Sequence, residues 1–471
     1  MAGPPPGPAK EVRFPAFEEQ TLANGLRVVV LRQHEQPLVS LQLVLLAGRT
    51  FEPAGKEGVA AATADLLTQG TKTRSTQQIA EAIDFVGGNL SANASLESAF
   101  ATAEVTSDQI GLGFELLSDV VLHPSFEQAE LDRWRQRALS DLRVREESAG
   151  YLADTALQRL LFAEHPYGRP GRGTAASVAG LTREDLVVFH ARRYVAGQAL
   201  LAVVGDVEPA DAFARARQVF GGWSAGEPVE VPAVVAPPKA VRRILVIDKP
   251  GAVQTAIRLG QVALAFRDPD RSISKVYDSV AGGSISARLG NELRVKRGLT
   301  YGASSLFATP SQPGWFTAST STKTATTVEV ISVALDVLRG LATHAVPEAE
   351  LNSARTYITG AFPLEIETAG GTARKVIEAM RYGYGREFLE RTNERISAVT
   401  AAELQRFARE RMPADAMTIV LVGNAAAFSA ELEEKFGAFE TIPAAQLDFR
   451  SPDLRAAVPA EPPAPAPAPV P

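Results

Sequence analysis

The sequence predicts an α+β fold made of two similar sandwich domains, each of about 200 residues. Two observations predict it. One helix-loop-strand segment occurs twice, 218 positions apart, and each half of the chain opens with apolar strands that lead into longer helices. With 471 residues, 45% of them hydrophobic and 22% charged, the chain can bury two large cores without disulfide bonds.

The repeat lies between residues 181–207 and residues 399–425, and it needs no gap. Each copy reads as an amphipathic helix, a loop and a short apolar strand that ends in glycine. A Phe-Gly pair follows each copy, at an offset of 216. So many matches in register indicate a duplication. The matched pairs are Thr182 and Thr400, Leu186 and Leu404, Phe189 and Phe407, Gly205 and Gly423, then Phe220-Gly221 and Phe436-Gly437.

The start of each half has the apolar composition of β-strands. Strands are expected at residues 24–32 and 38–48 in the first half, and at 244–249 and 255–265 in the second. Helices are expected to follow, for example at 128–147 and 326–341. Neighbouring strands with helices after them favour a mixed sheet covered by helices in each half.

Pro-rich and Gly-rich stretches set the expected domain boundaries. Residues 1–14 and 448–471 are predicted to be tails, and the Pro-rich stretch at 227–243 is predicted to be a linker. The two domains are then residues 15–226 and 244–447.

Composition excludes several classes of function. The 48 basic and 54 acidic residues give a net charge of −6, which argues against nucleic-acid binding. There is no cysteine, so thiol catalysis and thiolate metal sites are excluded. No apolar run is long enough to predict a transmembrane helix, and the N-terminus lacks the apolar region of a secretion signal. The protein is therefore expected to be cytoplasmic, or to have lost a signal.

The histidines are spread along the chain, and the closest two are 25 positions apart. A zinc-binding pair on one helical turn would need a spacing of three or four residues. Each histidine is therefore interpreted as a surface or loop residue, including the one in the His-Pro-Tyr-Gly loop. The five are His34, His123, His165, His190 and His344.

Two segments of the first half, residues 46–75 and 164–207, resemble the pitrilysin/insulinase superfamily of zinc metallopeptidases, in particular its bacterial processing-peptidase-like members. The resemblance implies a duplicated mitochondrial-processing-peptidase-like fold that forms half of a clamshell. Residues 86–107 resemble the edge-strand region to which catalytic subunits add a substrate strand, although ordinary strand pairing explains them equally well.

In this superfamily the first segment carries H-x-x-E-H, whose histidines bind zinc and whose glutamate is the general base. Here Ala61 and Asp65 occupy the histidine positions, Ala64 replaces the base, and Asp141 stands at the third ligand position. Alanine has no lone pair to offer, and two carboxylates without imidazole make a poor zinc site. The chain is therefore expected to bind no catalytic zinc.

The second half retains a different part of the superfamily's pattern. Arg294 and Tyr301 lie seven residues apart within residues 282–305, at the end of an expected helix and the start of an expected strand. The resemblance implies that this pair reaches a peptide held at a partner's zinc. A tyrosine hydroxyl can stabilise a developing oxyanion, and an arginine can hold a peptide carbonyl or carboxylate. Lys296 and Arg297, which lie between the two, are interpreted as solvated charges.

The resemblance therefore implies the non-zinc subunit of a heterodimeric zinc metalloendopeptidase. Such a subunit is inactive alone, has a homologous H-x-x-E-H partner that binds the zinc, and acts on unfolded peptides. It also implies a periplasmic location. Two alternatives remain open: a catalytically silent structural or peptide-binding homologue, like core subunits of respiratory complexes, and an unrelated hydrolase. No nucleophile elbow or phosphate-binding loop supports the hydrolase.

Overall fold

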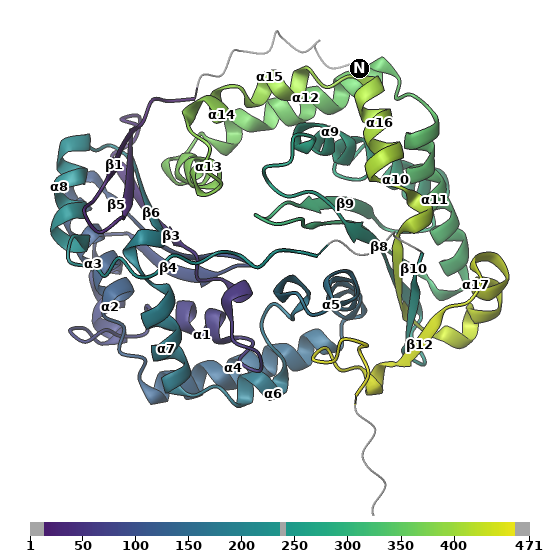
Figure 1. Ribbon diagram of the computed structural model, residues 1–471, viewed down its shortest axis with the longest axis horizontal. Coiled ribbons are helices and arrows are strands. Elements are labelled where there is room, and N and C mark those ends of the chain that lie inside the picture. Colours follow the sequence, from purple (N-terminus) through teal and green to yellow (C-terminus); the bar gives the residue numbers. More distant parts are fainter. Residues whose placement is uncertain (1–13, 236–241, 457–471) are drawn as a thin grey trace, which may run out of the picture.

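The computed structural model describes residues 14–235 and 242–456, and it contains two six-stranded mixed sheets with helices packed on them (Figure 1). The α+β prediction with two similar domains is confirmed. Strands of the first sheet come from residues 18–205, and strands of the second from residues 244–443. Within the described ranges, no helix is both long enough and apolar enough to cross a membrane.

The first sheet has the order β1-β2-β6-β3-β5-β4. Only β2 and β6 pair in parallel, and the other neighbours are antiparallel. Its strands are β1 (Glu18–Thr21), β2 (Arg27–Arg32), β3 (Leu38–Leu45), β4 (Asn89–Ala94), β5 (Ala99–Thr106) and β6 (Ala199–Gly205). The helices of this half are α1 (Val59–Leu66), α2 (Thr76–Phe85), α3 (Ile110–Leu122), α4 (Gln128–Glu146), α5 (Ala149–Phe162), α6 (Ala175–Ala179), α7 (Arg183–Arg193) and α8 (Pro209–Phe220).

The second sheet has the matching order β12-β7-β11-β8-β10-β9. Its strands are β7 (Ile244–Asp248), β8 (Gln254–Val262), β9 (Ala303–Ala308), β10 (Trp315–Lys323), β11 (Thr418–Gly423) and β12 (Glu440–Pro443). The helices are α9 (Arg271–Ala281), α10 (Arg288–Gly290), α11 (Thr327–Thr343), α12 (Glu348–Glu365), α13 (Ala369–Arg381), α14 (Arg386–Glu390), α15 (Thr392–Ser397), α16 (Ala401–Arg411) and α17 (Ser429–Phe436).

The repeated segment found in the sequence forms equivalent structure in both halves. Thr182 and Thr400 each cap a helix, α7 and α16, through a capping box with the third helical residue. The glycines that end β6 and β11 are required by close packing. A Cβ at Gly205 would lie 2.0 Å from the carbonyl oxygen of Leu38, and a Cβ at Gly423 would lie 2.5 Å from the hydroxyl of Thr255.

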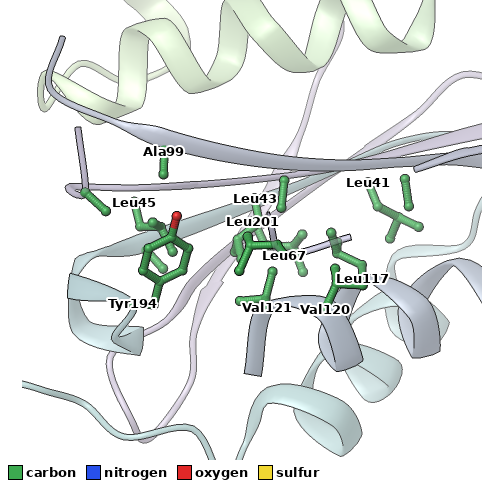
Figure 2. Close-up of a cluster of buried hydrophobic side chains, with 14 of the residues drawn as sticks. Leu41, Leu43, Leu45, Leu67, Ala99, Leu117, Val120, Val121, Tyr194 and Leu201 are labelled. Atoms are coloured by element: carbon green, nitrogen blue, oxygen red, sulfur yellow. The ribbon is translucent and has the colours of Figure 1, made fainter. Parts of the chain in front are cut away.

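The core of the first half forms between one face of its sheet and the helices beneath it. Figure 2 shows Leu41, Leu43 and Leu45 of β3 among Leu117, Val120 and Val121 of α3. These side chains alternate with residues on the opposite sheet face, as the two-residue period of a strand requires. All six are at most 3% exposed, so they are core residues.

One helix of each half packs on the sheet of the other half (Figure 1). The helix α5 buries Leu152, Leu157 and neighbours against β7, β8 and β11 of the second sheet. A Cβ at Gly260 of β8 would lie 2.7 Å from the Cδ2 atom of Leu157. In return, α13 covers the first sheet with Val376, Ile377 and Met380. The two sandwiches are thus completed by exchanged helices.

The chain continues as packed structure beyond the boundary expected at residue 448. Phe449 and Leu454 are buried in the cluster formed by α5 and the second sheet. The guanidinium of Arg159, on α5, donates to the carbonyl oxygens of Arg450 and Ser451. Residues 448–456 therefore belong to the folded second half. Most of the two predicted tails, and residues 236–241 of the predicted linker, lie outside the described residues.

Candidate functional site

The helix α1 carries the positions of the degenerate zinc motif, and buried contacts hold its N-terminus. Gly58 precedes the helix with a φ of 102°, a left-handed conformation that favours glycine. One oxygen of the Glu52 carboxyl group accepts from the backbone N–H groups of Gly58 and Ala60, both at 2.9 Å. Burial raises the pKa of Glu52 to about 8. Sequence reasoning missed Glu52, because only the fold places it at this helix.

The two alanines of the motif are packed into the first-half core. Ala64, at the general-base position, is fully buried, and Ala61 is half-buried against the same core cluster. Neither side chain has an atom that can bind a metal or accept a proton. The core encloses the Ala64 position, whereas the Ala61 position remains partly exposed.

The two aspartates of the motif have separate partners. Asp65 Oδ2 accepts from the indole Nε1–H of Trp134 at 2.9 Å, and Asp141 Oδ2 accepts from Arg145 Nε at 2.7 Å on the surface of α4. Across the described ranges, no three His, Cys, Asp or Glu side chains form a group that could hold a metal ion. The donor set at these positions does not fit zinc, which prefers imidazole and thiolate ligands.

The second candidate region is the connection from α10 to β9, which carries Arg294 and Tyr301. Arg294 lies in the π-helical turn Asn291–Lys296, and Tyr301 lies two residues before β9 begins. The backbone between them is held in place. Leu299 N donates to Leu293 O at 2.8 Å, and the Thr300 hydroxyl is 2.7 Å from the carbonyl oxygen of Ser321 on β10.

The side chains of Arg294 and Tyr301 are exposed. Tyr301 is 92% exposed, and Arg294 is exposed as well. Within residues 14–235 and 242–456, neither has a hydrogen bond or an ion pair to another side chain. The other nearby cations differ: Lys296 and Arg297 pair with Glu292, and Arg288 binds Glu350 through two hydrogen bonds of 2.8 and 2.7 Å. The pair therefore stands apart from the solvated charges around it.

Exposed apolar side chains accompany the pair, and sequence reasoning did not single them out. Ile285 is 93% exposed, Val295 is 72% exposed and Leu306 of the edge strand β9 is 50% exposed. Large apolar side chains grouped on one segment of a surface are typical of an interaction site. The sequence gives only a weak amphipathic pattern at these three positions, because each is a single apolar residue among polar ones.

A buried polar cluster joins the two halves. The carboxylate of Glu97 is 1% exposed and accepts from the hydroxyl of Tyr167, from the backbone and side chain of Ser311, and from the guanidinium of Arg381. Tyr167 belongs to the His-Pro-Tyr-Gly loop. His165 of that loop accepts from Tyr167 N and contacts the carbonyl oxygen of Pro232, so it has a structural role.

The comparisons with known proteins match both halves. Residues 27–175 match the model of the insulinase family, peptidase family M16, and residues 180–358 match the model described as the peptidase M16 inactive domain. An uncharacterized zinc protease of Mycobacterium leprae is 30% identical over 415 residues, which are 85% of this chain and 90% of that protein. The chain belongs to the M16 peptidase family.

Two solved structures share the fold. A peptidase M16 inactive domain from Pseudomonas fluorescens is 26% identical, with a TM-score of 0.82 over 86% of this chain and 98% of that one. A protease from Helicobacter pylori has a TM-score of 0.80 at 20% identity, covering 87% of this chain and all of that chain. The family and the duplicated architecture predicted from the sequence are therefore confirmed.

Proposed function

We propose that this M16 chain is the non-zinc subunit of a heterodimeric zinc metalloendopeptidase. Its partner would be a homologous subunit with an intact H-x-x-E-H motif, and its substrates would be unfolded peptides. In this proposal the chain has no peptidase activity alone. It contributes Arg294 and Tyr301 to peptide bound at the zinc site of the partner.

The degenerate motif on α1 supports the proposal that this chain has no peptidase activity alone. The base position is a fully buried alanine, and the remaining motif carboxylates are engaged by Trp134 and Arg145. An M16 active site needs two imidazoles, a carboxylate ligand and a general base. A chain without them requires another subunit for hydrolysis.

The observation that carries the proposal is the exposure of Arg294 and Tyr301 without partners on this chain. The neighbouring Arg288 differs, because its guanidinium is paired with Glu350. A free phenol can donate to the oxygen that becomes negative when a peptide carbonyl is attacked. A free guanidinium offers a rigid fork of donors to a peptide carbonyl or a terminal carboxylate. Both groups are thus available to a substrate brought by another subunit.

The exposed apolar residues of the same segment fit this role. Ile285 and Val295 would be covered when a partner or a peptide lies against the Arg294–Tyr301 segment, and apolar burial on binding is favourable. The backbone contacts of Leu299 and Thr300 hold the segment before binding. A preorganised segment loses less conformational freedom on binding.

A peptidase assay with three arms tests the proposal. A quenched fluorescent peptide is given to this chain, to an M16 subunit from the same organism that carries H-x-x-E-H, and to a mixture of the two. The proposal predicts hydrolysis in the mixture alone, together with a heterodimer on size-exclusion chromatography. Activity of this chain alone would contradict it. Equal activity of the partner with and without this chain would favour the silent structural homologue.

A further inference from the structure

A pocket separate from the motif region lies among helices α9, α12, α13 and α14 of the second half. It has a volume of about 270 Å³. Part of its wall is apolar, formed by Ile358 and Phe362 of α12 and by Leu389 of α14. The rest is charged. Because α13 is the helix exchanged onto the first sheet, the pocket lies directly behind the contact between the halves.

Three cations and two carboxylates line this pocket. Both carboxylates are used by two of the cations. Arg271 Nη2 lies 2.9 Å from Glu378 Oε1, and Lys375 Nζ lies 2.7 Å from Glu365 Oε2 and 3.6 Å from Glu378 Oε2. Lys275 is the third cation, and no carboxylate of the described residues lies within 4.0 Å of its Nζ atom. The pocket therefore carries one uncompensated positive charge.

The position of Lys275 makes that charge unfavourable without a partner. Burial lowers the pKa of the Lys275 ammonium to about 8, and the nearby guanidinium of Arg271 acts in the same direction. Glu378 and Glu365 act in the opposite direction, but they are already paired with Arg271 and Lys375. Arg271 also stacks over Phe266, with its Cζ atom 3.7 Å from the ring centroid. Lys275 is half-buried and has no ion pair within the described residues, and an anion bound in the pocket would compensate its charge.

We propose that this pocket binds a small monocarboxylate with a short apolar tail, whose carboxylate pairs with Lys275. One negative charge balances the single excess positive charge. A phosphate dianion would instead bring excess negative charge beside Glu365 and Glu378. The apolar wall of Ile358, Phe362 and Leu389 accounts for the tail, and the volume admits only a few carbon atoms. The same chemistry is offered by a free short-chain acid and by the C-terminal residue of a peptide.

Binding to the intact chain can be measured by isothermal titration calorimetry with isovalerate as the probe. The expected result is millimolar affinity for isovalerate, with at least tenfold weaker binding of neutral isovaleramide and of inorganic phosphate. N-acetyl-leucine distinguishes the sources of the carboxylate, because tighter binding than isovalerate indicates a peptide C-terminus and weaker binding a free acid. Equal binding of isovaleramide and isovalerate, or no binding of either carboxylate, would overturn the proposal.

The substitution Lys275→Met keeps the length of the side chain and removes its charge, and it is expected to weaken isovalerate binding at least tenfold. Lys296→Met is the matched control, since Lys296 is exposed and paired with Glu292, and it should bind as the wild type does. A second measurement uses the wild-type chain alone. Isovalerate should protect Lys275 from reductive methylation, as detected by mass spectrometry, and leave Lys296 reactive. Unchanged binding by a folded Lys275→Met chain, or no protection of Lys275, would contradict the assignment.

Discussion

The two halves of this chain differ in the segment between β3 and β4 in the first half and the segment between β8 and β9 in the second. In the first half this segment contains α1, whose motif positions hold the buried Ala64, the partly exposed Ala61, and Asp65, which accepts from Trp134. In the second half it presents Arg294 and Tyr301 to solvent. The same architecture carries side chains without donors or with partners inside the chain in one half, and exposed side chains without such partners among the described residues in the other.

That difference separates what the fold needs for stability from what it does not. A duplicated fold keeps its sheets and caps because both halves need them to be stable. Exposed polar side chains without partners contribute little to stability. Their presence in one half, beside a motif that has lost its donors in the other, fits a chain that assists catalysis without performing it. Each of the following predictions tests one side of this contrast.

Metal content gives the largest expected effect. The wild-type chain and Asp65→His are expected to retain no zinc after dialysis, because Ala61 supplies no lone pair. A variant with Ala61→His, Ala64→Glu, Asp65→His and Asp141→Glu is expected to retain about one zinc per chain, because it restores two imidazoles and a carboxylate ligand. Inductively coupled plasma mass spectrometry measures the content. One zinc per wild-type chain would contradict the expectation that the first half has lost its metal site.

The exchanged helices predict that the halves unfold together. Leu157→Ala on α5 and Ile377→Ala on α13 each remove a buried side chain from the opposite sheet, and each should lower the free energy of unfolding by about 2–4 kcal/mol. Urea unfolding followed by circular dichroism measures this. The control Val144→Ala, at a position 70% exposed, should change it by less than about 0.5 kcal/mol. Two separate transitions would show that the halves are independent.

Acid should destabilise the first half through His190. Its Nε2–H donates to the carbonyl oxygen of Val121 at 2.8 Å, and burial lowers its pKa from 6.5 to about 4. Between these values the unfolded chain binds a proton and the folded chain does not, so stability falls as the pH falls. The loss should reach about 2 kcal/mol at pH 5.

The duplication supplies a natural comparison for this histidine, because the matching position in the second half is Ala408, which does not titrate. Replacing His190 with Gln keeps a donor for Val121 and removes the titration. Unfolding in urea at pH 7 and at pH 5 should therefore show a smaller loss of stability in His190→Gln than in the wild type. An equal loss in both chains would mean that other groups cause the acid sensitivity.

The smallest effect on stability is expected from the hydrogen bond between Trp134 and Asp65 in the degenerate motif. Trp134→Phe removes the hydrogen bond to Asp65 and should cost about 1 kcal/mol in unfolding free energy beyond the change in apolar area. Trp315→Phe is the matched control, because its indole makes no hydrogen bond to the described residues. Equal losses of unfolding free energy in the two variants would show that the hydrogen bond to Asp65 contributes nothing to stability.

The sequence predicted the parts of the fold that depend on local signals. Thr182 and Thr400 begin helices, and Gly205 and Gly423 end strands, because each acts on its own neighbours. The exchange of α5 and α13 could not be predicted, since an apolar helix face shows that it will be buried but not against which sheet. Residues 448–456 were missed for the same reason, because Phe449 and Leu454 are isolated apolar residues near a Pro-rich end.

For the candidate site, too, some features could be predicted from the sequence and others depend on the fold. The loss of donors at Ala61 and Ala64 is visible in the letters of the sequence, whereas the engagement of Asp65 by Trp134 requires the packing of α1 against α4. The exposure of Arg294 and Tyr301 also depends on the fold, because helix ends and strand starts are often buried. Lys275 is an ordinary lysine in the sequence, and only the packing of four helices encloses it.

The most direct test of the central claim is the rate of peptide hydrolysis by the mixed subunits when this chain carries Tyr301→Phe. Loss of the phenol donor is expected to lower kcat by about 10²-fold with heterodimer formation unchanged, and Arg294→Ala should lower kcat/KM to a similar extent. Lys296→Ala, two residues from Arg294 and paired with Glu292, should leave the rate unchanged. A mixture with full activity despite both substitutions would show that the pair does not act in trans.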